Sequence, residues 1–332
     1  LIDLDSPISH YGVSVSGSPS VTVRHLLTHT SGDVPGTTHV YDGARYALLG
    51  GVIEGASGRT FATELTERIL IPLEMTDTAL NPISSFGDTS LLRVEDFQMS
   101  LGWGSLFGNY PDVYRRAARP YQFDNDYSTI PGMSHLTHNP AAGLLSSVTD
   151  LAAFDMAFER GDLLDAATRQ EMLTSAYPIP GGHTGSGYGL GWYVQDFGDM
   201  RIEWHTGRWP PSTSALYARF PDYGRTLIVL ANTDNLTVPF YGLGHGDVMN
   251  SLLSLVFYRH FMYPDIHGGA LTEVDWSAPA ADIEATLEDE TDPVALEFLE
   301  RELWAYRQAF SSSGQVDQVD QLAFARVALF PA

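Results

Sequence analysis

Cysteine and lysine are both absent from this sequence of 332 residues. Without cysteine the chain forms no disulfide, carries no thiolate nucleophile and has no cysteine-based metal site. All 18 basic residues are arginine and 41 residues are acidic, so the formal net charge at pH 7 is −23. Because phosphate binding needs clustered cations, this balance argues against nucleic acid as a partner.

The surplus of acidic residues has two explanations, and composition alone does not choose between them. A strongly acidic, lysine-free surface suits a saline environment, where charge repulsion is screened. An arginine-rich genome of high GC content that encodes an ordinary acidic protein gives the same composition.

Long apolar runs are also missing, since none reaches the roughly 18 residues that a membrane span needs. Hydrophobic residues still make up 44% of the chain, which is enough for a sizeable core. The chain begins at Leu1, inside a patterned segment and without a methionine. We therefore expect an N-terminal part of the protein to lie outside this sequence.

The strongest local pattern is an antiparallel hairpin with a polar triplet at its entry. Residues 202–205 and 214–220 are typical of strands, and residues 221–224 are a turn with proline, aspartate and glycine in favourable order. Residues 226–230 are a buried, β-rich run. The triplet His205-Thr206-Gly207 combines an imidazole, a hydroxyl and a residue without a side chain. This combination suits a site where substrate lies against backbone.

Helical periodicity and capping residues predict most of the remaining elements. Thr22 is the expected N-cap of a helix that ends at Gly32, and Thr149 is the expected N-cap of one that ends at Gly161. Further helices are expected within residues 41–54, 60–71, 165–175, 248–261, 283–290, 293–310 and 319–329. Residues 84–133 are irregular and rich in glycine and aromatics, which indicates a lid or a substrate wall.

His25 and His29 lie four residues apart, a spacing that also occurs in metal sites. No glutamate lies in the intervening turn and no third ligand is evident, so a structural, hydrogen-bonding role is favoured over metal binding. The His-Glu-x-x-His motif of zinc hydrolases is absent from the sequence, which argues against a zinc hydrolase. We expect no metal and no cofactor.

Seven short segments follow one another in a characteristic order. They are Leu4-Asp5-Ser6-Pro7, residues 23–32, residues 41–54, residues 141–147, residues 188–192, His205-Thr206-Gly207 and Leu230-Ala231-Asn232. In this order they resemble the serine β-lactamase/penicillin-binding protein family, in its branch of class C β-lactamase-like hydrolases and esterases. The resemblance covers residues 1–232.

The resemblance implies an α/β fold of the α+β type, like that of β-lactamases and transpeptidases, with an antiparallel sheet flanked by helices and a mostly helical subdomain. We expect this domain over residues 1–263, lacking its N-terminal segment, with the helical subdomain at about 24–173 and the sheet part at about 186–263. An acidic, helical C-terminal extension is expected over residues 264–332. Without the missing segment the sheet would expose an edge. We therefore expect the chain to be unstable unless that segment is present as another chain.

The chemistry of this family is acyl transfer through a serine in a Ser-x-x-Lys turn. That motif is absent from a chain without lysine, and the resemblance places it shortly upstream. Tyr41 matches the general-base tyrosine of the family, and His205 would orient the hydrogen-bond network. Thr206 would hydrogen-bond the substrate within the triplet that Gly207 completes. The backbone N–H of Arg208 would be the second donor to the oxyanion.

Two departures from the family pattern bear on the substrate. The family's Tyr-x-Asn reads Tyr41-Asp42-Gly43, so Gly43 offers no side chain and Asp42 would substitute only in part. His205 replaces a lysine, and a mostly neutral histidine attracts a substrate carboxylate less strongly. With the net charge of −23, these departures favour an esterase or D-amino-acid peptidase-like enzyme over a true β-lactamase. The expected substrate is a small ester, amide or peptide-like molecule.

A non-catalytic relative that binds peptide-like or acyl ligands is the alternative, and Gly43 is its main support. The presence or absence of Ser-x-x-Lys upstream of Leu1 separates the two. The resemblance also implies a periplasmic or secreted protein.

Overall fold

A computed structural model describes residues 2–15, 18–81, 83–84, 110–123, 129–131, 137–179, 186–210, 213–234 and 246–312. The expected helix at 319–329 and most of the segment 84–133 lie outside these residues. Inside them, no helix has both the length and the apolar character that crossing a membrane requires.

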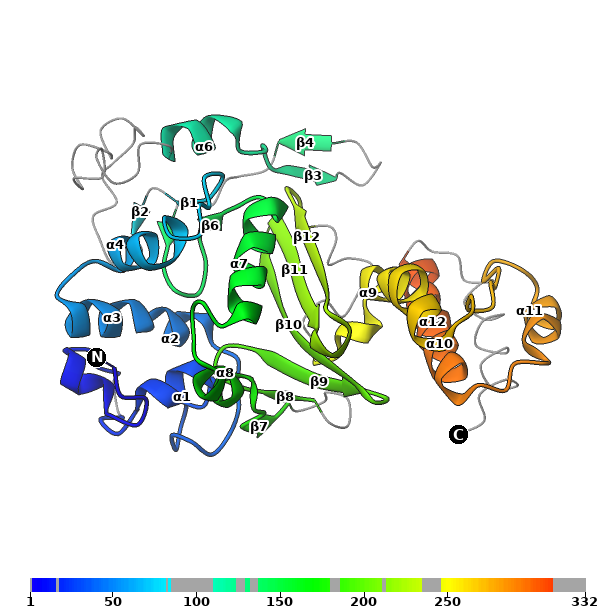
Figure 1. The fold of residues 1–332 in the computed structure, drawn as a ribbon, viewed down its shortest axis with the longest axis horizontal. Helices are drawn as coiled ribbons and strands as arrows, with labels where there is room; N and C mark the ends of the chain where they lie inside the picture. Colours follow the sequence, from blue (N-terminus) through cyan, green and yellow to red (C-terminus); the bar gives the residue numbers. More distant parts are fainter. Residues whose placement is uncertain are drawn as a thin grey trace.

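A six-stranded antiparallel sheet lies at the centre of the fold, with the strand order β12-β11-β10-β9-β8-β7 (Figure 1). Its strands are β7 (Tyr177–Pro178), β8 (Gly187–Tyr188), β9 (Tyr193–Phe197), β10 (Met200–Trp209), β11 (Thr213–Phe220) and β12 (Arg225–Ala231). The expected hairpin is confirmed, because η3 (Pro221–Tyr223) and Gly224, which has a φ of 58°, turn the chain from β11 into β12. Three small strand pairs accompany the sheet: β1 (Ala79–Leu80) with β6 (Leu144–Leu145), β2 (Ile83–Ser84) with β5 (Thr137–His138), and β3 (Tyr121–Phe123) with β4 (Thr129–Pro131).

Helices lie on both sides of the sheet (Figure 1). The N-terminal group is η1 (Ile8–Tyr11), α1 (Val23–Leu27), α2 (Gly43–Ala47), α3 (Leu49–Ser57), α4 (Phe61–Leu65), η2 (Thr66–Leu70) and α6 (Tyr110–Arg116). Next come α7 (Val148–Arg160), which packs on the sheet, and α8 (Ala166–Leu173). The C-terminal group is η5 (Val248–Asn250), α9 (Leu252–Phe257), η6 (Tyr258–Met262), α10 (Tyr263–His267), α11 (Ala280–Leu287) and α12 (Pro293–Ser312). The predicted fold class, an antiparallel sheet flanked by helices, is therefore confirmed.

Several of the expected helix boundaries are wrong. The helix capped by Thr22 ends at Leu27, with Thr28 as its C-cap, and not at Gly32, because the φ of His29 is 53°. Ser147, not Thr149, is the N-cap of α7, because its backbone is extended and its hydroxyl accepts the N–H of the third helical residue at 3.1 Å. The helix expected over residues 248–261 is broken into η5, α9 and η6. The Asp247 side chain caps η5, and the extended backbone of Ser251 separates η5 from α9.

The face of the sheet that meets the C-terminal helices is apolar. Ile202 and Trp204 on β10 alternate with residues of the other face, as do Leu216, Ala218 and Phe220 on β11, and all five are fully or almost fully buried. They share one hydrophobic cluster with buried residues of α9, α11 and α12. The boundary after residue 263 stays a prediction, but the helices beyond it complete the core of the sheet.

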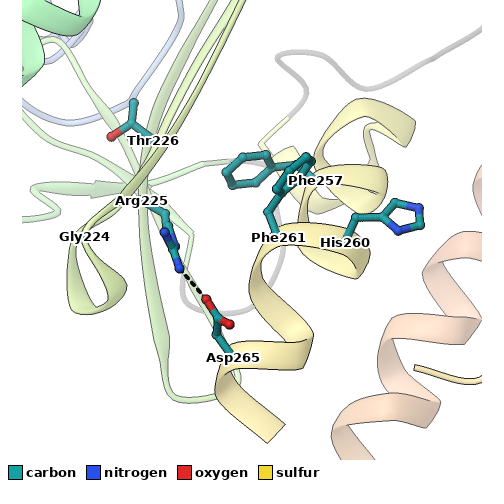
Figure 2. Close-up of a pocket in the computed structure, with 7 residues that line it drawn as sticks. All are labelled: Gly224, Arg225, Thr226, Phe257, His260, Phe261 and Asp265. Carbon is teal, nitrogen blue, oxygen red and sulfur yellow. Dashed lines mark hydrogen bonds and ion pairs between the residues drawn. The ribbon is translucent and has the colours of Figure 1, made fainter. Parts of the chain in front are cut away.

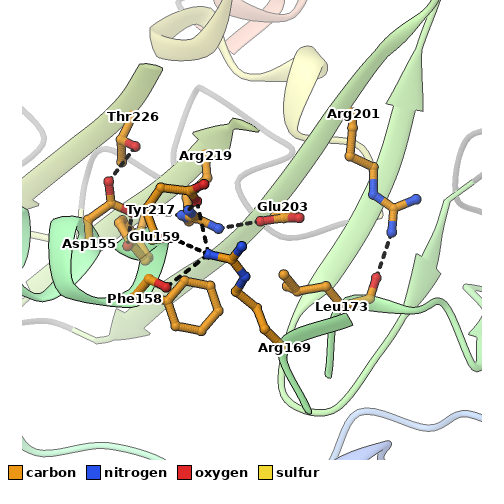
Figure 3. A network of polar contacts seen from close by, with 10 residues as sticks. All are labelled: Asp155, Phe158, Glu159, Arg169, Leu173, Arg201, Glu203, Tyr217, Arg219 and Thr226. Atoms are coloured by element: carbon orange, nitrogen blue, oxygen red, sulfur yellow. Dashed lines mark hydrogen bonds and ion pairs between the residues drawn. The ribbon is translucent and has the colours of Figure 1, made fainter. Parts of the chain in front are cut away.

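The opposite face carries a buried ion-pair network around Arg219 (Figure 3). Arg219 lies on β11, and its side chain is 4% exposed. It pairs with its cross-strand partner Glu203 on β10 and with two carboxylates of α7, Asp155 and Glu159. Its guanidinium carbon also lies 4.8 Å from the ring centre of Phe158. The network therefore fastens α7 to β10 and β11.

The described sheet ends at β12, which pairs as a strand with β11 alone. Natural edge strands are usually protected by charges, proline or bulges. Residues 226–231 carry no charge and no proline, and Leu230 is 38% exposed. This strand is therefore one edge of the described sheet, and its exposure through a missing N-terminal segment stays a prediction.

Replacing Arg219 with methionine should destabilise the protein by about 3–5 kcal/mol, because Glu203 would stay buried without its cation. Arg225→Met is the matched control, since the ion pair of Arg225 with Asp265 is solvent-exposed and such pairs contribute about 1 kcal/mol or less. Urea denaturation measures the free energy of unfolding of both variants. Equal losses in the two would contradict the stabilising role of the buried network.

Candidate active site

Bonds between the helical part and the sheet hold the two walls of the site together. The backbone N–H of Gly191, just before β9, donates to the carbonyl of Leu27 at the end of α1, at 3.0 Å. The hydroxyl of Tyr177 on β7 donates to the carbonyl of Gly36 at 2.8 Å. An ion pair between α1 and α8 is a third link. The end of α1 and the loop that follows it are therefore fixed against β7, α8 and the turn between β8 and β9.

Glycine is required at position 191. The φ of Gly191 is +86°, and an added Cβ would lie 2.6 Å from the hydroxyl of Tyr46. The segment 188–192 can thus bring the sheet within hydrogen-bonding distance of the helical part.

Tyr41 lies in the loop before α2, and its ring faces residues of β8, β9 and β10. Its ring stacks on His29 with centres 4.2 Å apart. The same ring lies 6.0 Å from the ring of His205 and 6.3 Å from that of Tyr193. Tyr41 is 50% exposed, so it is accessible from solvent. The fold therefore brings together Tyr41 and His205, two of the residues that the sequence predicts for the site.

His205 on β10 is held through both of its ring nitrogens. Nε2 lies 3.1 Å from the hydroxyl of Tyr188 on β8, and Nδ1 lies 2.7 Å from the carbonyl oxygen of Thr206. Since a carbonyl only accepts, Nδ1 carries the proton and Nε2 accepts from Tyr188. Burial lowers the pKa of His205, so its ring is neutral at pH 7. This geometry suits a residue that orients the hydrogen-bond network and leaves no ring nitrogen for a substrate.

The rest of the triplet extends β10 beyond its pairing with β9. In the described residues β9 pairs with Met200–Trp204, whereas β11 pairs with β10 as far as Trp209. Thr206 is half-buried and Gly207 is exposed at this free side. A Cβ added at Gly207 would meet Ala215 at 3.7 Å, an ordinary contact. Packing therefore does not require glycine at this position.

The charged groups predicted at the site each have a partner. The guanidinium of Arg208 pairs with Asp234 at 3.1 Å. The carboxylate of Asp42 caps α2 by accepting the N–H of Arg45 at 3.0 Å, and it lies 3.6 Å from the guanidinium of the same arginine. The backbone N–H of Asp42 donates to His29 Nδ1 at 3.0 Å. Asp42 thus shapes the loop before α2.

The described aromatic centre of the site is uncharged at pH 7. Burial raises the pKa of Tyr41 and raises the pKa of Tyr46 to about 12. Burial, followed by the neighbouring His39 and His205, lowers the pKa of His29 to about 4. A tyrosine becomes a general base at neutral pH when a nearby cation lowers its pKa, and no described residue does this for Tyr41. The phenol of Tyr41 is therefore protonated here.

Aromatic side chains that the sequence does not predict as site residues complete this centre. The ring of Tyr188 lies 5.1 Å from His29, 5.0 Å from His39 and 4.7 Å from Tyr193, measured between centres. Tyr193 also stacks on Trp204 at 4.2 Å. Several of these residues lie in or beside the family motifs, and this position was the one signal in the sequence that they belong to the site. A linear motif does not show which of its side chains converge.

Two cavities lie elsewhere on the described surface. One, of about 370 Å³, lies between the β11–β12 turn and the C-terminal helices and is lined by Gly224, Arg225, Thr226, Phe257, His260, Phe261 and Asp265 (Figure 2). The other, of about 580 Å³, is a mostly apolar groove along α3 and α4. Neither is lined by Tyr41 or His205. The described residues contain no group of three or more histidine, cysteine, aspartate or glutamate side chains that could hold a metal ion. His25 and His29 both have hydrogen-bonding roles, as predicted, because the Nδ1 of each accepts a backbone N–H.

Comparisons with known proteins agree with this fold. A sequence model of the family described as Beta-lactamase matches residues 1–242. Penicillin-binding protein 4* of Bacillus subtilis (strain 168) is 27% identical over 254 residues, which are 65% of this chain and 52% of the relative. The octameric penicillin-binding protein homologue from Pyrococcus abyssi has a TM-score of 0.56 and 21% identity, over 70% of this chain and 56% of its own. A D-stereospecific amidohydrolase from Streptomyces sp. has a TM-score of 0.53 and 22% identity, over 70% and 75%.

The fold and the matched motifs define a class of protein, the beta-lactamase-like proteins, whose fold is shared by a penicillin-binding protein homologue and a D-stereospecific amidohydrolase. The family match covers more than half of the chain, and the chain therefore belongs to the beta-lactamase family. It spans about half the length of the curated relative that it matches. At under 25% identity, the likeness to the solved structures establishes the fold and not the reaction.

Acid should destabilise the protein between about pH 6.5 and pH 4, in part through His29. In this range the unfolded chain protonates His29, while the folded protein keeps it neutral down to about pH 4. The free energy of unfolding should therefore lose about 3 kcal/mol from this residue as the pH falls through the range. His29→Asn removes the titrating group and should make the free energy of unfolding less dependent on pH, as measured by urea denaturation at each pH. An unchanged dependence would contradict a neutral, buried His29.

Proposed function

We propose that this chain is part of a serine hydrolase that acts through an acyl-enzyme on a small ester or amide. One observation carries the proposal, the convergence of Tyr41 with the strand that bears His205-Thr206-Gly207. Membership of the beta-lactamase family supports the reaction class. A periplasmic or secreted location, which the resemblance implies, is part of the same proposal.

The nucleophile and its lysine, on this proposal, come from a Ser-x-x-Lys segment outside these 332 residues. That segment is either continuous with this chain or present as a separate one. The sequence contains no lysine, and Tyr41 has no cation among its described neighbours. An ammonium group beside the phenol would lower the pKa of Tyr41 and allow it to accept the proton of the serine hydroxyl.

Strand β10 supplies the substrate-binding side of this mechanism. The Thr206 hydroxyl hydrogen-bonds the substrate, and Gly207 lets the substrate approach the backbone. The backbone N–H of Arg208 is the second donor to the oxyanion. The exposure of Gly207, at a position where packing does not require glycine, supports this role. His205 holds Tyr188 in place behind the strand, and Asp42 fixes the loop that carries the catalytic tyrosine.

The charges at the site favour a substrate without a carboxylate. His205 is neutral with both nitrogens engaged, and the guanidinium of Arg208 is paired with Asp234. The net charge of −23 also repels anions at long range. Penicillins and peptides that end in D-alanine carry a carboxylate, whereas simple esters and amino-acid amides do not. A short ester or a D-amino-acid amide therefore fits better than a β-lactam.

A non-catalytic protein that binds acyl or peptide-like ligands is the second candidate. Gly43 supports it, because the family asparagine that would hold a substrate amide is missing and no atom lies within 4 Å of a Cβ added there. Labelling of the full-length protein by a fluorophosphonate, lost when the serine of an upstream Ser-x-x-Lys is replaced by alanine, would exclude this candidate. A coding sequence without that motif would favour it.

The full-length protein should hydrolyse p-nitrophenyl butyrate or D-phenylalanine amide faster than a cephalosporin, compared by kcat/KM at pH 7. The physical reason is the absence of an unpaired cation for the cephalosporin carboxylate among the described site residues. Faster turnover of the cephalosporin would overturn the proposed substrate class while leaving the reaction class intact.

Tyr41→Phe in the full-length protein should lower kcat by about 10²–10⁴-fold, because the general base is lost while the ring and its packing remain. Tyr223→Phe is the matched control, since this half-exposed tyrosine lies in the turn between β11 and β12, away from the site. Steady-state kinetics should show wild-type kcat for the control. Similar kcat values in the two variants would remove Tyr41 from the mechanism.

A further inference from the structure

His29 adopts a backbone conformation that histidine rarely takes. Its φ is 53°, and Glu74 is the one other described non-glycine residue with positive φ. This conformation follows the C-cap of α1 at Thr28 and brings the ring of His29 against the loop that carries Tyr41. Strained backbone persists where the surrounding structure over-determines it, and it gathers at functional sites.

Three of the contacts of His29 surround Tyr41. Its carbonyl oxygen accepts the backbone N–H of Val40 at 2.9 Å, and its Nδ1 accepts the backbone N–H of Asp42 at 3.0 Å. These are the two neighbours of Tyr41 in the chain. The ring of His29 stacks on the Tyr41 ring itself, with centres 4.2 Å apart and planes inclined by 30°. His29 thus contacts the residue before Tyr41, the residue after Tyr41 and the Tyr41 ring.

We propose that His29 is a positioning residue that fixes the ring of Tyr41 for proton transfer. The inference rests on the proposed function, in which Tyr41 is the general base. It concerns placement alone. Because Nδ1 accepts the Asp42 N–H, the proton of the neutral ring is on Nε2. A neutral imidazole stacked on the phenol supplies no cation, so the lysine of the proposed mechanism keeps its role.

The test separates the ring of His29 from its backbone role. Asparagine tolerates positive φ, and its side-chain oxygen can accept the Asp42 N–H, but it has no ring to stack. His29→Asn in the full-length protein should lower kcat for p-nitrophenyl butyrate by about 10- to 100-fold, as small displacements of catalytic groups do, with KM changed less than about twofold. His29→Gly suits the same φ, lacks both contacts and should lower kcat at least as far.

His25→Asn is the matched control. His25 lies one turn earlier on the same segment, and its Nδ1 likewise accepts a backbone N–H, that of Thr22 in the capping box. It makes no contact with Tyr41 among the described ring contacts and should leave kcat at the wild-type value. A loss of kcat in His25→Asn equal to that in His29→Asn would point to a general loss of structure and overturn the proposal.

A double-mutant cycle distinguishes positioning from stability. If His29 acts through Tyr41, His29→Asn should change kcat by less than about twofold once Tyr41→Phe is present. An equal factor in both backgrounds would overturn the proposal.

A readout independent of activity is the NMR signal of the Tyr41 ring, assigned by its loss in Tyr41→Phe. Ring stacking shifts this signal, so His29→Asn should move it and His25→Asn should not. An unmoved signal would overturn the placement of Tyr41 by His29. If Tyr41→Phe keeps wild-type kcat, the proposed function of Tyr41 fails, and the NMR result still decides whether His29 holds its ring.

Discussion

The register between β10 and β11 is the constraint on which both the fold and the site depend. Glu203 lies opposite Arg219, and Trp204 lies opposite Ala218. Because side chains alternate along a strand, Glu203 and His205 share the face that meets α7 and the helical part, while Trp204 enters the apolar cluster. A slip of β11 by one residue would carry the Arg219 cation toward the core, and a slip of β10 by one residue would turn His205 away from Tyr41. The same pairings therefore serve both stability and the geometry of the site.

Much of this arrangement could be predicted from the residues, and the failures have local causes. The hairpin was predictable because proline, aspartate and glycine occur where its turn needs them. The start of α7 was not, because Ser147 and Thr149 both carry hydroxyls and the choice depends on which residue has extended backbone. Tyr41 and His205 came from a motif resemblance. The bond between His205 and Tyr188 depends on how β8 packs beside β10, which no local pattern records.

All 18 basic residues are arginine, and this limits what the positive charges of the chain can do. Arginine stays protonated at any ordinary pH and binds carboxylates through a rigid fork, so it suits permanent contacts such as those of Arg219 and of Arg259 with Glu302. It cannot take part in proton exchange as lysine does. The described site is correspondingly a set of neutral histidines and tyrosines, shaped by burial and stacking. In the proposed mechanism, the cation beside Tyr41 is a lysine and not an arginine.

The links between Gly191 and Leu27 and between Tyr177 and Gly36 also set how the site meets a ligand. They join the helical part to the sheet by direct hydrogen bonds. Walls tied in this way cannot swing together around a bound molecule without breaking backbone contacts. A preorganised site of this kind favours affinity, because binding costs little conformational entropy of the protein. Selectivity in such a site depends on how well the shape of the ligand fits the site as it stands. Because the protein moves little, closure of the site should not increase the affinity of rigid ligands over that of flexible ones.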